Sequence, residues 1–297
     1  MGWTPADIPD LTGRRAIVTG ANAGLGLQIA HGLAAAGAEV VLACRNQEKA
    51  QRAAAEITAA NPAATVSVGE LDLADLDSVA AFAAAQSGRL DLLVNNAGLM
   101  AVDESRTAQG VETQFGVNHL GHFALTARLL PLLLATPGSR IGSMSSMGHR
   151  GARGQQPPQR YDRWQAYFHS KLANLLFTAE LQRRLAAAGA STIAVAAHPG
   201  GSNTDLGTEG SGLANKAMGL LAPIFAQPAA LGARPMLRAM TDPTVAGGEF
   251  YGPRFVAFGA TPVRETPTRA ARDDDRARRL WERSVELTGL EPALSTA

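Results

Sequence analysis

The sequence alternates short apolar runs with longer segments of helical spacing, and this alternation restricts the fold more than any other feature. Early runs rich in β-branched residues and nearly free of internal charge predict buried strands at residues 15–19, 38–45, 65–71 and 90–96. The segments between them place their apolar residues on one helical face, at residues 25–37, 46–60 and 76–86. Strand–helix–strand units of this length imply right-handed crossovers. The sequence therefore predicts an α/β fold, a doubly wound parallel sheet with helices on both faces.

The second half continues this rhythm. It predicts helices over residues 112–134, 164–188 and 271–289, and strands over residues 140–145 and 191–197. Because no linker rich in Pro, Gly or Ser divides the chain, residues 1–297 are expected to form a single domain.

Two stretches depart from the rhythm. Residues 151–160 predict a loop, and residues 205–234 contain the uncharged run 217–233. This run is shorter than the ~20 residues that a membrane span needs, and Pro223 and Pro228 interrupt it. It predicts core or lid helices, with contact at a membrane surface as the alternative.

The amino-acid composition excludes several classes of function. With 27 Lys and Arg against 26 Asp and Glu, the net charge is +1, which provides no basic surface for the phosphates of nucleic acid. A hydrophobic content of 46% excludes a disordered scaffold. The single cysteine, Cys44, excludes an internal disulfide and a cysteine-rich metal site, and it suits a reducing cytosol. The first residues lack the basic-then-apolar order of a signal peptide, so a cytoplasmic location is expected.

A glycine-rich turn, TGANAGLG, follows the first predicted strand and runs directly into a helix. Gly20, Gly24 and Gly26 would let the chain turn tightly and let backbone N–H groups approach a pyrophosphate, at the positive end of the helix. A tight turn without a ligand is the alternative. The position between the first strand and the first helix of a parallel sheet favours a dinucleotide.

Four motifs occur in order, each at a predicted strand end or on the expected helix. They are TGANAGLG at 19–26, NNAG at 95–98, YFHSK at 167–171 and HPG at 198–200. Together they resemble the short-chain dehydrogenase/reductase family over residues 13–259. The segments GVNHLGHFALTARLL and YFHSKLANLLFTAEL resemble its retinol-dehydrogenase-like branch. The resemblance implies a Rossmann-type fold and a hydride transfer that uses a nicotinamide dinucleotide.

Cofactor preference is argued from the end of the second strand. NAD-preferring relatives usually place an acidic residue there, which accepts the ribose hydroxyls and repels a 2′-phosphate. Here the position is Cys44, followed by Arg45, and an uncharged residue beside a guanidinium favours a phosphate dianion. We therefore expect NADP(H) over NAD(H), with a merely solvated Arg45 as the alternative. The resemblance assigns the other cofactor contacts to Gly20, Asn22, Gly24, Leu25, Gly26, Asp72, Asn95, Ala97, Gly98, Tyr167, Lys171, Pro199, Gly200 and Thr204.

Tyr167 and Lys171 are the expected catalytic pair, one helical turn apart on a shared face. A tyrosine has an ordinary pKa of ≈10, and a nearby ammonium should lower it. Lysine is scarce in this arginine-rich chain, where only Lys49 and Lys216 accompany Lys171, and a compact ammonium is what this position requires. Tyr161 is not a rival, because Gln165 at the same offset carries no charge.

The family pattern completes the catalytic group with Ser146, at the end of a strand, and Asn118, which kinks its helix and holds a water beside the lysine. Ser145 would point to the opposite face of a regular strand. His119 and His122 are expected to pack or to lie on the surface, and no metal is expected, because their spacing lacks a carboxylate partner.

The expected activity is interconversion of an apolar alcohol and its aldehyde or ketone. Residues 205–234 should cover this small substrate, because they carry Leu213, Met218, Leu220, Leu221, Ile224 and Phe225. Relatives commonly pair through the helices near 112 and 164, so a homodimer or homotetramer is expected, with no nucleic-acid partner. Two alternatives remain: a redox sensor or scaffold that binds the dinucleotide without turnover, and a peripheral membrane enzyme.

Overall fold

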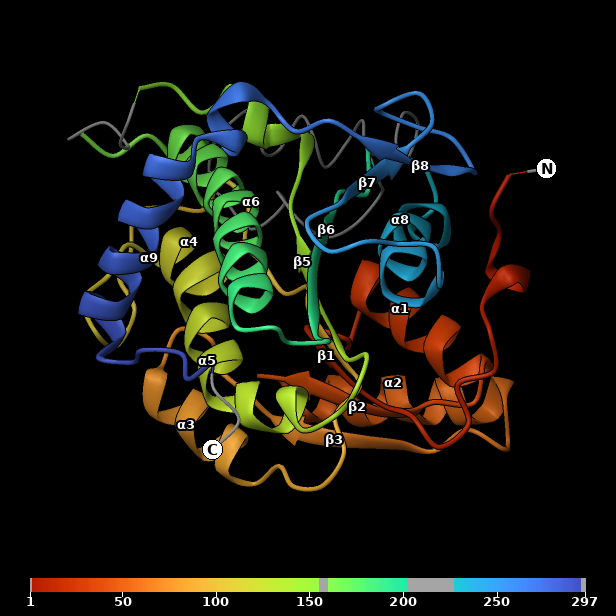
Figure 1. The fold of residues 1–297 in the computed structure, drawn as a ribbon. Coiled ribbons are helices and arrows are strands. Elements are labelled where there is room, and N and C mark those ends of the chain that lie inside the picture. The colour runs from red at the N-terminus through yellow and green to blue at the C-terminus, as the bar shows by residue number, and fades with distance from the viewer. Residues whose placement is uncertain (1, 155–159, 202–226, 295–297) are drawn as a thin grey trace.

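The computed structural model describes residues 2–154, 160–201 and 227–294. Its centre is one sheet with strand order β3-β2-β1-β4-β5-β6-β7-β8, in which β1 to β7 are parallel and β8 is antiparallel (Figure 1). The strands are β1 (Arg15–Thr19), β2 (Glu39–Cys44), β3 (Val66–Glu70), β4 (Leu92–Asn95), β5 (Arg140–Met144), β6 (Ile193–Ala197), β7 (Phe250–Pro253) and β8 (Pro262–Glu265). The predicted doubly wound parallel sheet is confirmed.

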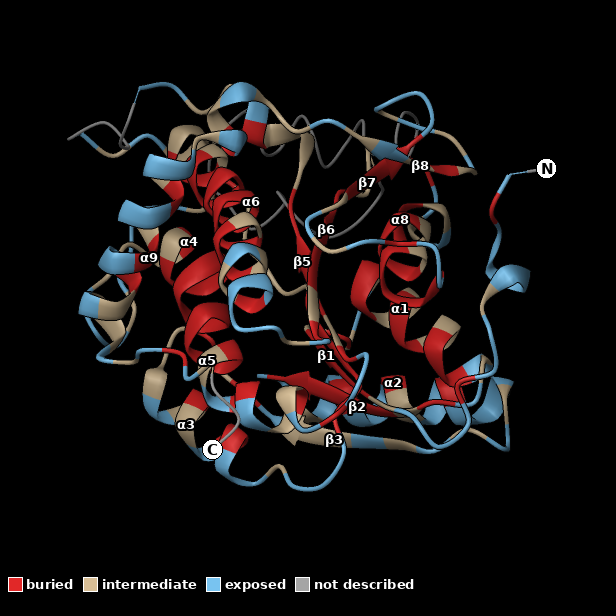
Figure 2. Cartoon of the chain, in the orientation of Figure 1, coloured by how far each residue is buried: buried red, intermediate tan, exposed pale blue. Residues whose placement is uncertain are grey.

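Helices cover both faces of this sheet. One face carries α1 (Gly24–Ala35), α2 (Gln47–Ala60) and α8 (Ala229–Thr241). The other carries α3 (Leu76–Ala84), α5 (Gly121–Leu134) and α6 (Arg163–Ala187), with α9 (Asp274–Thr288) packed along α6. Figure 2 shows the central strands and the inward sides of α5 and α6 as buried.

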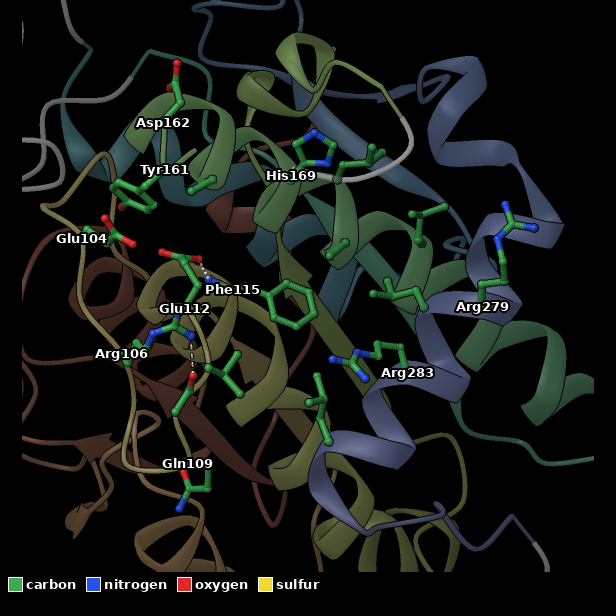
Figure 3. A pocket seen from close by; sticks show the side chains of 18 of the residues that line it. Glu104, Arg106, Gln109, Glu112, Phe115, Tyr161, Asp162, His169, Arg279 and Arg283 are labelled. Atoms are coloured by element: carbon green, nitrogen blue, oxygen red, sulfur yellow. Dashed lines mark hydrogen bonds between the residues drawn. The ribbon is translucent and has the colours of Figure 1, made fainter. Parts of the chain in front are cut away.

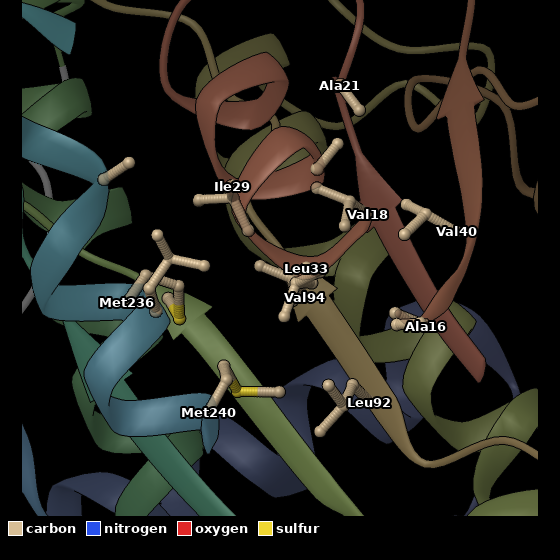
Figure 4. Close-up of a cluster of buried hydrophobic side chains, with 14 of the residues drawn as sticks. Ala16, Val18, Ala21, Ile29, Leu33, Val40, Leu92, Val94, Met236 and Met240 are labelled. Carbon is tan, nitrogen blue, oxygen red and sulfur yellow. The ribbon is translucent and has the colours of Figure 1, made fainter. Parts of the chain in front are cut away.

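Alternation along the strands divides the core into two layers. On β1, Ala16 and Val18 face α1 and pack with Ile29 and Leu33 (Figure 4). The residue between them, Ile17, joins the opposite cluster. Strands buried on both faces need apolar residues at successive positions, and this is why the early runs are continuous rather than alternating.

The predicted helix 112–134 is not continuous. It consists of α4 (Thr113–Phe115), a π-helical turn (Gly116–Leu120) and α5. A π-turn inserts a residue and widens the helix, and it commonly marks a functional position. Its middle residue is Asn118, which the family pattern associates with a kink.

The C-terminal part contains elements that the sequence analysis did not predict, namely α8, β7 and β8. Residues 202–226 lie outside the described residues, including Thr204 and all six apolar residues expected to cover the substrate. The described end of the 205–234 stretch is the start of α8, where Ala233 is fully buried and the helix packs on α1. This end belongs to the core, which agrees with one of the two interpretations of the run 217–233, and the expectation that 205–234 covers the substrate stays a prediction.

Two other predictions have clear outcomes. The closing helix is confirmed as α9, with the Asp273 side chain accepting a hydrogen bond at its start and Gly289 at φ +66° after its end. The predicted loop 151–160 begins one residue late, because Gly151 still belongs to a 3-10 helix (Met147–Gly151), and residues 155–159 lie outside the described residues. Among the helices that the structure describes, none is both long and apolar enough to cross a bilayer.

Candidate active site

The four motifs meet at one edge of the sheet. The glycine turn follows β1, NNAG follows β4, Ser146 follows β5 and HPG follows β6. These strands are neighbours and parallel, so their carboxyl ends lie side by side. The strand order reverses between β1 and β4, and open α/β sheets bind ligands outside the carboxyl ends at such a switch point.

The glycine turn leaves a cradle that larger residues would fill. Gly20 has φ +64°, and a Cβ there would lie 2.9 Å from the Cβ of Ala97. A Cβ on Gly26 would lie 2.6 Å from Nδ2 of Asn96 and would collide with the Gly20 carbonyl. The residue that precedes α1 is Ala23, which has no side-chain oxygen for the first helical N–H groups. A close-packed turn with an uncapped helix start fits a bound pyrophosphate, so these residues suit a dinucleotide.

A buried hydrogen-bond chain joins this turn to the catalytic helix. The Thr19 hydroxyl oxygen accepts from the N–H groups of Asn96 and Ala97 at 2.9 Å, and it lies 2.8 Å from Nε2 of His122. Nδ1 of His122 lies 3.1 Å from the Asn118 carbonyl, which can only accept, so Nδ1 carries the proton and Thr19 donates to Nε2. Burial lowers the pKa of His122 to about 4, which keeps the ring neutral.

His122 therefore packs in the core, as predicted. It also connects Thr19 of the glycine turn to Asn118 of the π-helical turn. His119 is buried as well, and its Nε2 lies 2.9 Å from the Ser284 hydroxyl of α9.

Two side chains on one face of α6, Lys171 and Asn174, are directed at the end of β5. Nζ of Lys171 donates to the Met144 carbonyl at 3.2 Å, and Nδ2 of Asn174 donates to the same oxygen at 3.0 Å. The Ser145 hydroxyl donates to the Lys171 carbonyl at 2.8 Å. Tyr167 and Lys171 are both buried, with exposures of 6% and 4%. Packing thus holds the Tyr–Lys face of the helix against the strand that carries the serines.

Ser146, rather than Ser145, lies beside Tyr167. Its hydroxyl oxygen accepts from the Gly148 N–H at 3.0 Å, and Ser146 lies near enough to the Tyr167 phenol to lower its pKa, against the larger effect of burial. The Tyr167 ring packs over Gly148, where a Cβ would lie 3.0 Å from it. The structure therefore brings the predicted serine and tyrosine hydroxyls together.

Burial controls the protonation of the pair. It raises the pKa of Tyr167 to about 12, against a smaller lowering by Ser146. It lowers the pKa of Lys171 to about 8. The expectation that the ammonium lowers the tyrosine pKa is wrong for this structure, because loss of water penalises the charged form of each group. Nζ of Lys171 lies 5.9 Å from the centre of the Tyr167 ring.

Asn118 joins the NNAG segment to the catalytic helix. Its Oδ1 accepts from the Leu99 N–H at 2.7 Å, and its Nδ2 donates to the Leu99 carbonyl at 2.9 Å and to the Ser170 hydroxyl at 2.8 Å. A Cβ on Gly98 would lie 3.1 Å from both Asn118 Oδ1 and Lys171 Nζ. Glycine is needed there so that the amide and the ammonium can both approach the backbone.

The remaining predicted cofactor residues differ in how they face the carboxyl ends of β1, β4, β5 and β6, where the dinucleotide groove is expected. Asn95 is buried and donates to Thr126 on α5 at 3.0 Å, so its side chain is directed into the core. Oδ1 of Asp72 accepts from the Ala74 N–H at 2.9 Å. The Pro199 carbonyl accepts from Gln227 at 2.7 Å. Leu25 is buried in α1, whereas Asn22 and Gly200 are half-buried. Direct cofactor contacts by all of these residues stay predictions.

Basic side chains lie at the other end of the groove. Arg45 is exposed directly after β2, and a shallow pocket of about 230 Å³ lies nearby, lined by Asn22, Lys49, Arg52, Ala53 and Glu56. No role was predicted for Lys49, although its being one of three lysines in the chain was a signal. Asn22 belongs to the glycine turn, so this pocket joins the turn to the start of α2.

A larger cavity, of about 940 Å³, lies on the opposite side of α6 from Tyr167 (Figure 3). Its α6 lining includes Ala166, His169 and Ala173, which a helical turn of 100° per residue places away from Tyr167 and Lys171. Glu104 and Glu112 lie on one of its sides, and Arg279 and Arg283 of α9 lie on the other. Of the four motifs, only His169 of YFHSK lines this cavity, and neither Tyr167 nor Lys171 does.

Comparison with known proteins agrees with this geometry. The family model described as short chain dehydrogenase matches residues 14–211. The chain belongs to the short-chain dehydrogenase family. It is 38% identical over 298 residues to human retinol dehydrogenase 13, covering 95% of this chain and 86% of the relative. It is 48% identical over 203 residues to mouse retinol dehydrogenase 11, covering 66% of this chain and 64% of that protein. The predicted resemblance to the family and to its retinol-dehydrogenase-like branch is confirmed.

Solved structures also resemble this short-chain dehydrogenase. The crystal structure of an uncharacterized protein from Mycobacterium Paratuberculosis matches with a TM-score of 0.83 at 43% identity, covering 99% of this chain and 100% of that one. An NAD(P)-dependent gluconate 5-dehydrogenase from Beutenbergia cavernae with bound NADP matches at 0.63 and 28% identity, covering 82% and 96%. A family member from Burkholderia phymatum in complex with NAD is 22% identical, covers 77% and 86% and has a TM-score of 0.63, so it shows the fold alone. The family binds nicotinamide dinucleotides of both kinds.

Proposed function

We propose that this short-chain dehydrogenase is an NADP(H)-dependent oxidoreductase that interconverts an apolar alcohol and its aldehyde or ketone. The observation that carries the proposal is the buried pair of Tyr167 and Lys171, with the half-buried Ser146 beside Tyr167 and Gly98 beside Lys171, at the switch point of the sheet. When bound, the dinucleotide supplies or accepts the hydride. The glycine turn and the start of α1 hold its pyrophosphate, and Lys171 holds its nicotinamide ribose.

Tyr167 acts as the general acid in the reducing direction. Its pKa of about 12 keeps the phenol protonated at neutral pH, so a proton is available when negative charge develops on the substrate oxygen. The Ser146 hydroxyl lies beside it and donates to the same oxygen. Because the Gly148 N–H fixes Ser146 and packing fixes Tyr167, both donors are in place before the reaction and need little reorganisation.

Lys171 lies beside Tyr167 and returns a proton to its phenol. A pKa of about 8 lets this amine exchange a proton near neutral pH, which an ordinary lysine does poorly. Asn118 is next to it at Gly98 and provides the polar path for the replacement proton. The π-helical turn and His122 keep Asn118 in that position.

The preference for NADP(H) rests on the exposed end of the groove. Cys44 is buried beneath the turn, and burial raises the thiol pKa to about 11. This neutral side chain does not repel a phosphate. Arg45 and Lys49 supply positive charge beside it, as a 2′-phosphate requires.

An apolar substrate is supported by two observations. The segment expected to cover the site is apolar in sequence, although it lies outside the described residues. The relatives that match most of the chain are named for retinol, an alcohol with a hydrocarbon body. We extend that substrate class, and not retinol itself, to this chain.

The test is a cofactor-depletion assay with a panel of aldehydes and ketones, run with NADPH and with NADH. Apolar carbonyl compounds should be reduced faster than sugars of similar size, and NADPH should be preferred. Fluorescence titration of each dinucleotide reports binding independently of turnover. Tight NADPH binding without reduction of any compound would instead favour the redox-sensor alternative.

We also propose a cytoplasmic location and a homo-oligomer. The lone buried cysteine supports the first. The second rests on the resemblance to relatives that pair through the helices near 112 and 164; α9 packs along α6 and covers part of that surface. Light scattering on the purified chain measures its mass in solution, and a monomer at all concentrations would contradict the pairing.

A further inference from the structure

Three charged or polar side chains form a bridge between two motifs that carry the proposed chemistry. His198 comes from the end of β6, Glu265 from β8, and Arg150 from the 3-10 helix that follows Ser146. Nε2 of His198 lies 3.0 Å from Oε1 of Glu265, and Nη2 of Arg150 lies 3.2 Å from Oε2 of the same carboxylate. Each oxygen of Glu265 therefore has its own donor.

The His198 side of the bridge fixes the turn predicted to border the nicotinamide. Nδ1 of His198 accepts from the Gly200 N–H at 3.1 Å, so the ring proton is on Nε2 and is donated to Glu265. The His198 ring is fully buried, and Gly252 of β7 packs so closely that a Cβ there would collide with both His198 and Glu265. The Gly200 N–H is thus held by His198 on one side of the turn, while Nε2 of Gln227 donates to the Pro199 carbonyl at 2.7 Å on the other.

The Arg150 side of the bridge is connected to Ser146. Arg150 belongs to the 3-10 helix whose first turn is capped by Ser146, and the preceding residue, His149, places its Nδ1 2.7 Å from the Ser146 carbonyl. The rings of His149 and His198 both pack against Phe250 of β7, with centre distances of 5.7 and 5.3 Å. The two sides of the bridge thus share a packed aromatic contact as well as the carboxylate.

We propose that Glu265 is a positioning residue that sets the spacing between the Ser146 hydroxyl and the Pro199–Gly200 turn. This inference rests on the proposed function, because the spacing matters when the substrate oxygen and the nicotinamide must meet. Glu265 touches neither, and it lies beyond the 14–211 segment that the family model matches. A small displacement of an aligned donor can lower a rate by about 10²-fold, so a remote carboxylate can affect the chemical step.

The two carboxylate oxygens of Glu265 have different partners, so the Gln and Ala substitutions should have different effects. In Glu265→Gln, the amide oxygen can still accept from His198, but the amide nitrogen faces the Arg150 guanidinium and cannot bond to it. In Glu265→Ala, both contacts are lost. The glutamine variant therefore releases the serine side alone, and Arg150→Met should have the same effect.

The experiment measures the NADPH dissociation constant by fluorescence titration, together with kcat and KM for the best apolar carbonyl substrate. Glu265→Gln and Arg150→Met should each lower kcat by about tenfold and change the dissociation constant by less than about twofold. Glu265→Ala should lower kcat similarly and also raise the dissociation constant by about tenfold. Glu249→Gln is the matched control: it alters a carboxylate just before β7, paired with Arg264 at 3.0 Å, and should leave all three values unchanged.

Each result of this experiment would support or contradict the positioning role of Glu265. If Glu265→Ala lowers the melting temperature but leaves kcat and the dissociation constant equal to those of Glu249→Gln, the carboxylate is only structural and the inference is wrong. Equal effects of the Gln and Ala variants on NADPH affinity would also contradict it. If the unmodified chain binds NADPH but reduces nothing, the proposed function fails by itself. Affinity in Glu265→Ala would then still test the contact with the Gly200 turn.

Discussion

The two ends of the proposed dinucleotide groove are built differently. At the catalytic end, Tyr167 and Lys171 are almost completely buried, and neighbouring backbone and side chains fix their positions. At the adenosine end, Arg45 and Lys49 are exposed on the segment that follows β2. The first end depends on desolvated groups with shifted pKa values, and the second on screened charge in water.

This difference predicts large effects for substitutions at the catalytic end and small effects for substitutions at the adenosine end. Groups taken out of water interact strongly, and their removal cannot be compensated by solvent, so changes there should alter rate or stability by several kcal/mol. Exposed charges are screened by water and salt and should contribute about 1 kcal/mol each. The following substitutions test this contrast in order of expected size.

Tyr167→Phe should have the largest effect. It removes the proton donor while preserving the ring that packs on Gly148, so kcat should fall by at least about 10³-fold with NADPH affinity close to that of the unmodified chain. Steady-state kinetics and fluorescence titration measure the two quantities. Tyr161→Phe is the control, because that hydroxyl donates to the Val102 carbonyl away from the groove. Near-normal turnover in Tyr167→Phe would disprove the mechanism.

Lys171→Met should change how the free energy of unfolding depends on pH, because burial disfavours the charged form of Lys171. The native pKa of about 8 lies below the ordinary value of 10.5, so above pH 8 the unfolded chain holds more protons at this position than the native one. Stability of the unmodified chain, relative to Lys171→Met, should therefore rise by about 2 kcal/mol between pH 8 and pH 10. Urea unfolding of both proteins at each pH measures this difference. A parallel pH dependence in the two proteins would show that Lys171 is not desolvated.

Arg45→Gln should alter cofactor choice by a smaller amount. Loss of one guanidinium contact to the 2′-phosphate should raise KM for NADPH by about tenfold, or about 1.4 kcal/mol, and leave KM for NADH almost unchanged. Arg283→Gln on α9, whose guanidinium pairs with Glu286, is a matched loss of an exposed arginine and should change neither constant. An equal rise for NADPH and NADH in Arg45→Gln would contradict the assignment to the phosphate.

Lys49→Gln should have the smallest effect. Its ammonium is a mobile, exposed charge at the edge of the 230 Å³ pocket, so KM for NADPH should rise about threefold. The effect should largely disappear in about 0.5 M salt, where the screening length is only a few ångströms. If the change persists undiminished at high salt, Lys49 makes a direct, desolvated contact, and the contrast between the two ends is weaker than proposed.

Much of the fold could be predicted from sequence because its signals are local. Strands β1 and β2 match their predicted runs within a residue, since a buried strand needs consecutive apolar residues wherever it sits in the sheet. Strand β3 also matches in extent, but it lies at the edge of the sheet and none of its residues is buried, so the prediction of a buried strand there is wrong. The short strands β7 and β8 lack such runs. β8 is an edge strand with Arg264 and Glu265 among its four residues, and a charged edge strand does not have the pattern of a buried one.

The candidate site divides in the same way. The i, i+4 spacing of Tyr167 and Lys171 places them on one helical face, whatever surrounds the helix. The direction of the tyrosine pKa shift depends on burial, which the spacing does not reveal, and here burial outweighs the ammonium. Likewise, the His122 link to Thr19 joins residues 103 positions apart, and the Asn118 side chain in the π-helical turn bonds to Leu99 and Ser170 on other segments.

The sequence by itself therefore determined the parallel sheet, the glycine cradle and the residues available for hydride-transfer chemistry, because periodicity, backbone freedom and helical spacing act over a few residues. Only the tertiary structure decided which serine meets Tyr167, how far each ionisable group is removed from water, and that Glu265 of β8 bridges the segments after β5 and β6. Those properties arise from contacts between distant parts of the chain, and they exist only once the sheet has brought its carboxyl ends together.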